Sequence, residues 1–284
     1  MSPLQGLLAS HPRWVALTGA GLSAGSGIPT YRNDRGEWQR SDPIQHQQFI
    51  QQEGARRRYW ARSMAGWTYV AASRPNEAHR ALARLEALGH IPLLATQNVD
   101  RLHQAAGHRQ VVDLHGRLDR VRCLTCAALY PRNAVQQQLL ALNPFLDRPA
   151  SAARPDGDAD LDESAVDSVQ VPSCASCAGT LMPDVVFFGG SIPTARLHSV
   201  DQALRNAGGL LVVGSSLQVY SGYRCCRQIR EQGKPLYIIN PGQTRADALA
   251  DLRLRAGAEE ALPALAQMLA RRPAAAAMMD AQHG

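Results

Sequence analysis

A glycine-rich turn that directly follows a short apolar stretch constrains the fold of this chain more than any other feature. Residues 14–17 are apolar and predict a buried strand, and the run after them contains Gly19-x-Gly21-x-x-Ala24. This spacing fits the glycine fingerprint of a dinucleotide-binding turn, with the permitted alanine at the last position. Glycine lets the backbone turn tightly and approach a pyrophosphate, whose charge suits the N–H groups of a following helix. Alone, the fingerprint is a weak signal.

Apolar runs and helical patterns alternate along the rest of the chain. We expect buried strands at residues 14–17, 92–95, 185–188, 210–213 and 236–239, and helices at 77–88, 195–206 and 259–271. This alternation predicts an α/β fold built on a Rossmann-like, doubly wound parallel sheet. Open sheets of this kind bind ligands at the carboxyl ends of their strands, and residues of ligand-binding type follow four of the expected strands: Gly19, Gln97, Gly214 and Asn240.

Composition bounds the class of protein. A length of 284 residues suits one large α/β domain with a small insertion. The net charge is +6, and of the 30 basic residues only Lys234 is a lysine. The arginines are scattered apart from residues 56–58, so we expect no nucleic-acid partner. No apolar run approaches the roughly 20 residues that span a membrane, and residues 1–12 lack the pattern of a signal peptide. We expect a cytoplasmic protein without a membrane partner.

Four of the six cysteines form two closely spaced pairs, Cys123-x-x-Cys126 and Cys174-x-x-Cys177. Disulfides or redox-active thiols are the alternatives to a metal site, and a cytoplasmic chain makes stable disulfides unexpected. Four thiolates leave no open coordination position on a tetrahedral ion, so the spacing predicts one structural zinc ion. The other two cysteines, Cys225 and Cys226, lie on an expected helix, and we expect them to be buried as small apolar side chains.

The order of the remaining motifs resembles a known family. The run Thr-Gln-Asn-Val-Asp-Arg-Leu-His at residues 96–103 precedes His115-Gly116, and the two cysteine pairs follow. With the glycine turn, this order resembles the sirtuin (Sir2) family of NAD-dependent protein-lysine deacylases, from about residue 15 to about residue 265. Segments 43–46, 58–62, 183–189 and 214–224 resemble more closely the class II branch, which includes the mitochondrial sirtuin four of animals.

This resemblance implies a single sirtuin-type domain over residues 1–284. Residues 1–115 and 185–272 would form the Rossmann-like NAD-binding part, and 116–184 a small zinc-binding module. Residues 143–172 are rich in Asp, Pro and Ala and are too long for an ordinary connection. They resemble the extended loop that class II sirtuins place near the active site, although a disordered hairpin is the alternative. Residues 273–284 are expected to be a disordered tail.

The resemblance also assigns His115 as the general base. In the sirtuin scheme the acyl-lysine oxygen attacks the ribose carbon that nicotinamide leaves, and an imidate forms. His115 would then deprotonate a ribose hydroxyl, a task that suits the pKa of histidine. The products are nicotinamide, O-acyl-ADP-ribose and free lysine. Two alternatives remain open from the sequence: a protein mono-ADP-ribosyltransferase, and a weakly catalytic NAD-sensing module.

NAD, the co-substrate of the family, would contact residues from all of these motifs. Asn98 and Asp100 would hold the nicotinamide amide with help from Ile28, although Asn-Val-Asp can also be a simple turn. Gln97 would touch the ribose, and Arg32 would face a phosphate or the nicotinamide ring. The other positions carried over for NAD are Gly19, Ala20, Gly21, Ser23, Pro29, Tyr31, Gly214, Ser215, Ser216, Asn240, Pro241, Gly242 and Ala258.

The expected partners are acylated-lysine proteins or peptides, bound by a monomer. The segment Val185, Val186, Phe187, Phe188 and Gly189 resembles the strand that pairs with the substrate backbone, a mode that tolerates many sequences. Tyr59-x-x-Arg62 resembles the pair with which desuccinylating sirtuins bind an acidic acyl group, since arginine can clamp a carboxylate. A helix-surface arginine beside a core tyrosine is an equally good interpretation.

Three positions depart from the family pattern. Tyr31 stands where many members have Phe, a difference shared with relatives of class II. Thr30 stands where most sirtuins have Asp, and Gly190 follows Phe188-Gly189 where an acidic residue is usual. The missing carboxylate at Thr30 lies next to the expected nicotinamide pocket. It puts catalytic efficiency in doubt, but not NAD binding.

Overall fold

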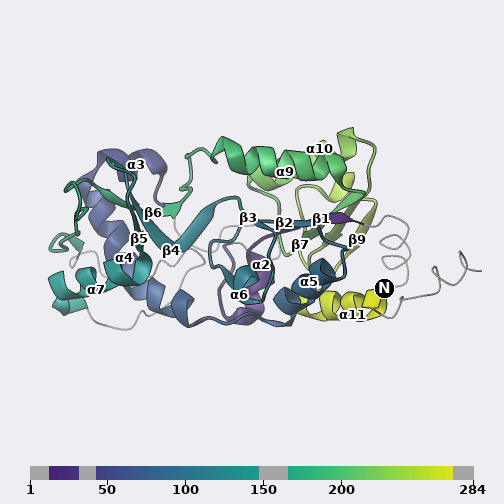
Figure 1. Ribbon diagram of the computed structural model, residues 1–284, viewed down its shortest axis with the longest axis horizontal. Coiled ribbons are helices and arrows are strands. Elements are labelled where there is room, and N and C mark those ends of the chain that lie inside the picture. Colours follow the sequence, from purple (N-terminus) through teal and green to yellow (C-terminus); the bar gives the residue numbers. More distant parts are fainter. Residues whose placement is uncertain (1–12, 32–42, 147–165, 271–284) are drawn as a thin grey trace, which may run out of the picture.

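A six-stranded parallel sheet forms the larger part of the protein in a computed structural model, which describes residues 13–31, 43–146 and 166–270 (Figure 1). The strand order is β3-β2-β1-β7-β8-β9, so the chain changes direction across the sheet between β1 and β7. This order confirms the predicted Rossmann-like sheet. The strands are β1 (Trp14–Thr18), β2 (Leu93–Thr96), β3 (Val111–Asp113), β7 (Gly209–Val213), β8 (Leu236–Ile239) and β9 (Leu252–Leu254).

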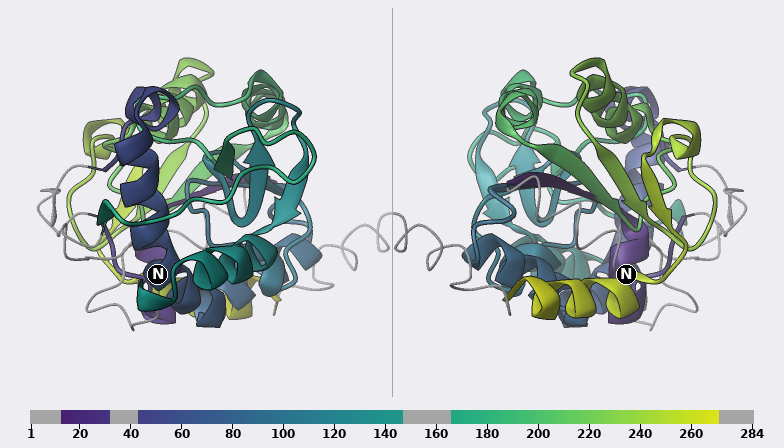
Figure 2. Two further views of the ribbon diagram at one scale, coloured as in Figure 1. Left: turned by 90° about the vertical axis from the view of Figure 1, so that its left-hand side faces the viewer. Right: turned by 90° about the vertical axis from the view of Figure 1, so that its right-hand side faces the viewer.

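Helices cover both faces of this sheet (Figures 1 and 2). Alternate residues of a strand point to opposite faces, and both sets of β1 are buried: Trp14 and Ala16 join one core cluster, and Val15 and Leu17 the other. This double burial explains why the strands appear in the sequence as continuous apolar runs. The first cluster includes α5 (Glu77–Ala87) and α11 (Ala258–Ala270), and the second includes α9 (Thr194–Asn206) and α10 (Tyr220–Glu231).

A second, antiparallel sheet contains β4 (Gly116–Cys123), β5 (Leu129–Pro131) and β6 (Leu181–Val185), in the order β5-β4-β6. The predicted strand at residues 185–188 of the parallel sheet is therefore wrong. Its apolar run satisfied the periodicity of a buried strand, which cannot distinguish a strand from other buried segments. In the structure β6 ends at Val185, and the N–H of Val186 donates to the carbonyl of His115 at 2.7 Å.

Three helices pack on this small sheet: α3 (His46–Gln51), α4 (Glu53–Ala72) and α7 (Arg132–Leu142) (Figure 1). Phe49 and Trp60 share one apolar cluster with Val121 and Leu139. Residues 44–64 therefore contribute to the core around the four paired cysteines. They lie within the range 1–115 that the sequence assigns to the NAD-binding part, but they pack on the small sheet. The short elements are α2 (Ala20–Ser23), α6 (Leu102–Ala105), and the 3-10 turns Ala24–Ser26, Pro144–Leu146 and Asp247–Leu249.

A buried arginine at the start of α7, Arg132, contacts three residues of α4. Arg132 is only 1% exposed, and its guanidinium carbon lies 5.3 Å and 5.4 Å from the ring centroids of Trp60 and Trp67. It also donates to the carbonyl of Ser63 at 3.1 Å. Burial lowers the pKa of Arg132 to about 10, which leaves it charged at neutral pH. Cation–π contacts on two rings therefore stabilise a charge inside this part of the protein.

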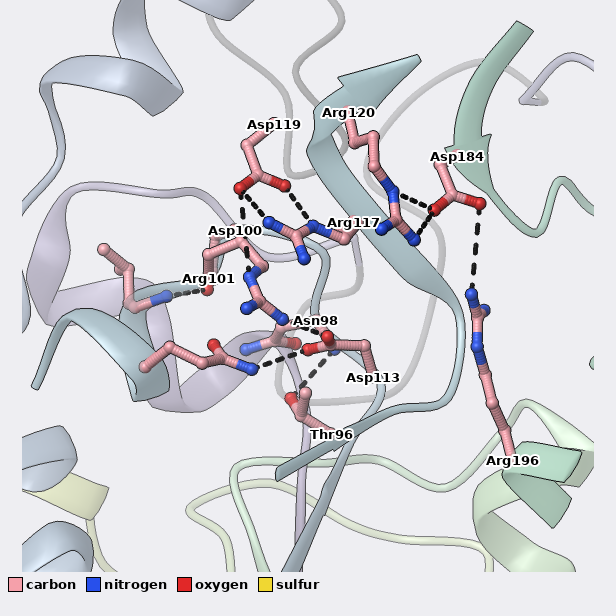
Figure 3. A network of polar contacts seen from close by, with 12 residues as sticks. Thr96, Asn98, Asp100, Arg101, Asp113, Arg117, Asp119, Arg120, Asp184 and Arg196 are labelled. Atoms are coloured by element: carbon pink, nitrogen blue, oxygen red, sulfur yellow. Dashed lines mark hydrogen bonds and ion pairs between the residues drawn. The ribbon is translucent and has the colours of Figure 1, made fainter. Parts of the chain in front are cut away.

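Ion pairs join the small sheet to the larger part of the protein (Figure 3). Asp184 on β6 binds Arg120 on β4, and its other oxygen lies 3.9 Å from Arg196 on α9. Arg101, directly after the Asn98–Asp100 motif, binds Asp113 at the end of β3, and its Nε atom lies 4.0 Å from Asp119 Oδ2 on β4. The same region holds two of the places where the chain passes between the parts, at residues 115–116 and 185–186. Charged pairs therefore stabilise the orientation of the small sheet where it joins the large one.

Three histidines are buried together behind the glycine turn. His79, His103 and His108 are all 3% exposed or less, and the rings of His79 and His103 lie 4.9 Å apart. Thr18 contacts the Nε2 atom of His103 at 2.9 Å. Burial lowers the pKa of His79 to about 4 and the pKa of His103 well below its ordinary value. The folded protein therefore holds His79 and His103 neutral.

This cluster predicts a loss of stability in mild acid. The unfolded chain protonates histidine near pH 6.5, but folded His79 does so only near pH 4. Between these values the unfolded state binds more protons, so the free energy of unfolding falls as the pH falls, by about 3 kcal/mol for His79 alone. Asp100 and Asp113, whose pKa values are raised by burial, oppose this fall at its acidic end. Urea unfolding between pH 8 and pH 4.5 measures the slope.

The matched variants are His79→Gln, which should flatten the slope, and His198→Gln, an exposed position on α9 that should leave it unchanged. A free energy of unfolding that stays constant between pH 7 and pH 5 would contradict neutral burial of the cluster.

Candidate active site

A cavity of about 700 Å³ opens at the carboxyl ends of the parallel strands, across the switch point between β1 and β7. Ligands bind at this place in open α/β sheets. Many residues predicted to bind or catalyse line it: Gly19, Ala20, Gly21, Tyr31, Tyr59, Gln97, Asn98, His115, Val185, Val186, Phe187, Phe188, Gly189, Gly214, Ser215, Ser216, Asn240, Pro241, Gly242 and Ala258. The described lining does not include Ser23, Ile28, Pro29, Arg62 or Asp100, and Arg32 lies outside the described residues.

The floor of the cavity is backbone packed on backbone. The N–H of Gly21 donates to the carbonyl of Gly214 at 2.8 Å, which ties the turn after β1 to the end of β7. A Cβ on Gly21 would lie 2.9 Å from that oxygen, and one on Gly214, whose φ is +61°, would lie 2.4 Å from the nitrogen of Leu22. Only glycine fits at either position. The result is an open cradle at the start of a helix, which suits a pyrophosphate.

Asn98 and Asp100 are linked through Ser23 beside this floor. The side-chain amide of Asn98 donates to the carbonyl of Gly19 and to Ser23 Oγ, both at 3.0 Å. Ser23 Oγ donates in turn to Asp100 Oδ2 at 2.7 Å, and the N–H of Leu102 donates to Asp100 Oδ1 at 2.9 Å. Burial raises the pKa of Asp100, which these two hydrogen bonds oppose. Asn98 therefore lines the cavity. Ser23 and Asp100, which are outside the described lining, fix the orientation of its side chain through hydrogen bonds.

His115 lies at the crossing from β3 to β4 with both ring nitrogens engaged. Its Nδ1 atom is 3.0 Å from the carbonyl oxygen of Gln97, and its Nε2 atom is 2.8 Å from Ser221 Oγ. A carbonyl only accepts, so Nδ1 carries the proton. Burial, together with the charge of Arg196, lowers the pKa of His115 against the Gln97 hydrogen bond. The imidazole is therefore neutral at pH 7, with an unprotonated Nε2 beside the cavity, as a general base requires.

Gln97 is held between β7 and α10. Ser215 Oγ donates to Gln97 Oε1 at 2.6 Å. On the other side a Cβ on Gly222 would lie 2.9 Å from Gln97 Nε2, so glycine at that position leaves room for the amide. Gln97 thus supplies its side chain to the cavity and its backbone carbonyl to His115.

The wall toward the small sheet is apolar and aromatic. Tyr59 lines it, with its ring edge-to-face against Phe49 and Phe187 at centroid distances of 5.5 Å and 5.1 Å. Phe188 also lines the cavity, and its carbonyl accepts from the N–H of His46 at 2.8 Å. Of the Tyr59–Arg62 pair, the described lining contains only the tyrosine.

Several lining residues were not predicted to act, among them Thr30, Glu259 and Ser221. Thr30 is one of the positions that depart from the family pattern. Glu259 lies so close to Gly25 that a Cβ on Gly25 would lie 1.9 Å from its carboxylate. Ser221 contacts His115 directly. It belongs to the segment at 214–224 that carries the class II resemblance, but its partner is 106 positions away, a separation that hides the contact in the sequence.

The four paired cysteines form a compact cluster that fits zinc. Their sulfur atoms all lie within 4.8 Å of one another, with Cys123 to Cys177 at 3.5 Å and Cys126 to Cys174 at 3.6 Å. A tetrahedral ion with Zn–S bonds of about 2.3 Å separates its ligands by about 3.8 Å. The thiols are free, and sulfurs this far apart are not disulfide-bonded. Cys225 and Cys226 are buried on α10, as predicted.

Comparison with known proteins gives consistent matches. Residues 19–221 match the model of the Sir2 family. An "NAD-dependent protein deacetylase 2" of Bradyrhizobium diazoefficiens is 50% identical over 260 residues, which cover 91% of this chain and 95% of the relative. An "NAD-dependent protein lipoamidase sirtuin-4, mitochondrial" of Bos taurus is 46% identical over 263 residues, covering 92% and 84%.

Solved structures match over nearly the whole chain as well. The complex of a Sir2 homologue with NAD has a TM-score of 0.73 at 29% identity, covering 95% of this chain and 94% of that one. A Sir2 complex with a p53 peptide and NAD⁺ has a TM-score of 0.76 at 28% identity, covering 94% and 97%.

Proposed function

Because the chain belongs to the Sir2 family, we propose that it is an enzyme that removes acyl groups from protein lysine side chains with NAD as co-substrate. Relatives at about 50% identity are NAD-dependent protein deacetylases. The observation that carries the proposal is His115: neutral, protonated at Nδ1, and presenting Nε2 in one cavity with Asn98. Acylated proteins or peptides are the proposed partners, and a cytoplasmic location stays a prediction. No described helix is long and apolar enough to cross a membrane.

The cavity has the features that an NAD molecule needs. Its volume of about 700 Å³ lies within the usual range for ligand sites. The glycine cradle would hold the pyrophosphate, and Gly214–Ser216 with Asn240–Gly242 would hold the adenosine end. When bound, NAD supplies a ribose carbon that can accept the acyl oxygen as nicotinamide leaves.

The side chains of this chain then have three tasks. Asn98, held by Gly19 and Ser23, orients the nicotinamide amide, and Asp100 fixes Ser23. The aromatic wall at Tyr59 and Phe187 excludes water from the acyl group. His115 Nε2 accepts the proton of a ribose hydroxyl and so raises the nucleophilicity of that oxygen. A structural zinc ion on the four cysteines would hold the small sheet that carries β6 and the segment after it.

The lining predicts a preference for uncharged acyl groups. Tyr59, Phe187 and Ile44 face the cavity, and Arg62 is absent from its described wall. An acidic chain would lose its hydration there, and the lining formed by the described residues offers it no cationic partner. We expect NAD-dependent turnover of acetyl-lysine and longer apolar acyl-lysine peptides to exceed that of succinyl- and glutaryl-lysine by at least about tenfold in kcat/KM. Mass spectrometry of the deacylated peptide and of O-acyl-ADP-ribose measures both products.

The matched variant is Arg62→Gln, which should change the ratio of acetyl to succinyl turnover by less than about twofold if Arg62 stays outside the pocket. Faster removal of succinyl groups that Arg62→Gln abolishes would contradict the preference and identify Arg62 as a clamp. No turnover of any peptide, with labelled ADP-ribose appearing on protein instead, would replace deacylation by mono-ADP-ribosyl transfer.

A further inference from the structure

Helix α10 begins beside the catalytic histidine. Ser221 is the second residue of this helix, and its Oγ atom lies 2.8 Å from His115 Nε2. The next residue, Gly222, lies against the side chain of Gln97. The backbone carbonyl of Gln97 accepts a hydrogen bond from Nδ1 of the same imidazole. The start of α10 therefore contacts both the base and the residue that holds it.

The direction of the hydrogen bond at Ser221 follows from the other side of the ring. Nδ1 donates to the carbonyl of Gln97, so in the neutral imidazole Nε2 has no proton and can only accept. The Ser221 hydroxyl must then be the donor. Two bonds at opposite ends fix the orientation of the ring, and both favour the tautomer in which Nε2 is the basic atom.

Burial and access distinguish Ser221 from a packing residue. It lines the cavity, and its hydroxyl points to an atom that must receive a proton during the reaction. Its backbone belongs to the first turn of a twelve-residue helix whose buried face, with Cys226 and Ile229, packs on the parallel sheet. The hydroxyl thus comes from a rigid element, as accurate positioning requires.

We propose that Ser221 is a positioning residue for the reaction: its hydroxyl holds His115 Nε2 at the cavity wall with the lone pair unprotonated, and the ribose hydroxyl replaces it as donor when the substrates are bound. The proposal rests on the proposed function, because it gives the base its task. It requires only that one hydrogen-bond donor be exchanged for another, after which the proton passes from the ribose oxygen to Nε2.

Comparing deacylation with nicotinamide exchange distinguishes a residue that positions the base from a residue that supports NAD binding. Exchange of labelled nicotinamide into NAD needs the glycosidic bond to break but needs no deprotonated ribose hydroxyl. Ser221→Ala should lower deacylation by about 10- to 100-fold, as expected when a general base is no longer held in place. Nicotinamide exchange should stay within about twofold. Ser221→Thr keeps the hydroxyl and should recover most of the deacylation. Ser199→Ala removes an exposed hydroxyl of α9, outside the described cavity lining, and should change neither reaction.

A measurement on the free protein tests the hydrogen bond without turnover. In protein with ¹⁵N-labelled histidine, the His115 signals should show a protonated Nδ1 and an unprotonated Nε2 at neutral pH. In Ser221→Ala the Nε2 signal should shift because the lone pair loses its donor, and the Nδ1 signal should stay in place. An Nε2 signal that is the same in both proteins would overturn the proposal.

The outcomes also separate this proposal from the function on which it rests. A wild-type protein that deacylates no peptide overturns the proposed function, while the ¹⁵N signals still decide whether Ser221 donates to His115. An active wild type with Ser221→Ala equally active overturns the role of Ser221 alone. Equal losses of deacylation and nicotinamide exchange in Ser221→Ala would show that the residue supports binding or folding, and would also overturn it.

Discussion

Replacing His115 by asparagine is expected to abolish deacylation and leave the protein folded. Asparagine can still donate from its side-chain amide toward the Gln97 carbonyl, which lies 3.0 Å from Nδ1 in the wild type, but it has no basic atom in place of Nε2. Loss of a general base costs about 10²- to 10⁴-fold in rate. The measurement is the rate of O-acyl-ADP-ribose formation at saturating NAD and acyl peptide.

NAD binding and folding do not depend on the base, so both serve as controls for the His115→Asn variant. Affinity for NAD should change little in His115→Asn, since the glycine cradle and the Asn98–Ser23–Asp100 chain do not contact the imidazole through any described hydrogen bond. The thermal unfolding midpoint should stay close to that of the wild type. Acyl removal at an undiminished rate would mean that another group takes the proton and would refute the assignment of His115 as the base.

Loss of the metal site is expected to unfold the small part of the protein. Cys174 is 3% exposed and belongs to the apolar cluster that also contains Tyr59 and Trp60. Structural zinc sites are worth about 10–16 kcal/mol in zinc-finger peptides, more than most domains possess as total stability. Cys174→Ser should therefore reduce bound zinc from one ion per chain to a small fraction, and abolish the cooperative unfolding of this part.

Elemental analysis by mass spectrometry and circular dichroism on heating measure the two effects. Cys226→Ala removes a cysteine of the parallel-sheet core and should keep one zinc per chain, with only a modest loss of stability. A wild-type protein purified without chelators that holds no zinc would contradict the four-cysteine site. So would a Cys174→Ser variant with full zinc content and an unchanged melting curve.

The parts of the fold that the sequence predicted are those with local signals. Strand β1 and the turn after it combine a buried apolar run with glycines at fixed spacing, and the structure places both at the switch point. Helix α5 begins after the Asn76 cap and ends before Gly89, whose φ is +79°. Local residues therefore predict both of its ends. The strands β7 and β8 are buried on both faces and are apolar throughout.

The rest depends on contacts between distant segments. Helix α4 has no apolar stripe because it is buried on several sides, and one of its contacts is the charged Arg132 of α7. The run at 185–188 is apolar because Phe187 packs on Phe49 and Tyr59, and its composition therefore resembles that of a strand in the parallel sheet. The edge strands β3 and β9 have only three residues each, too few for a periodic pattern. The hydrogen bond from Ser221 to His115 leaves no pattern at all.

The place of His115 at a chain crossing has a mechanical consequence. Gly116, with φ at +89°, begins β4 so close to the other crossing that a Cβ there would lie 2.1 Å from the carbonyl oxygen of Asp184. These two connections of the small sheet lie against each other beside His115, so a tilt of the small sheet against the large one would turn near this point. A body moves least at its pivot and most at its far end. The base would thus keep its position while Tyr59 swings toward or away from the acyl group, so that tightening the grip on a substrate need not disturb the atom that receives its proton.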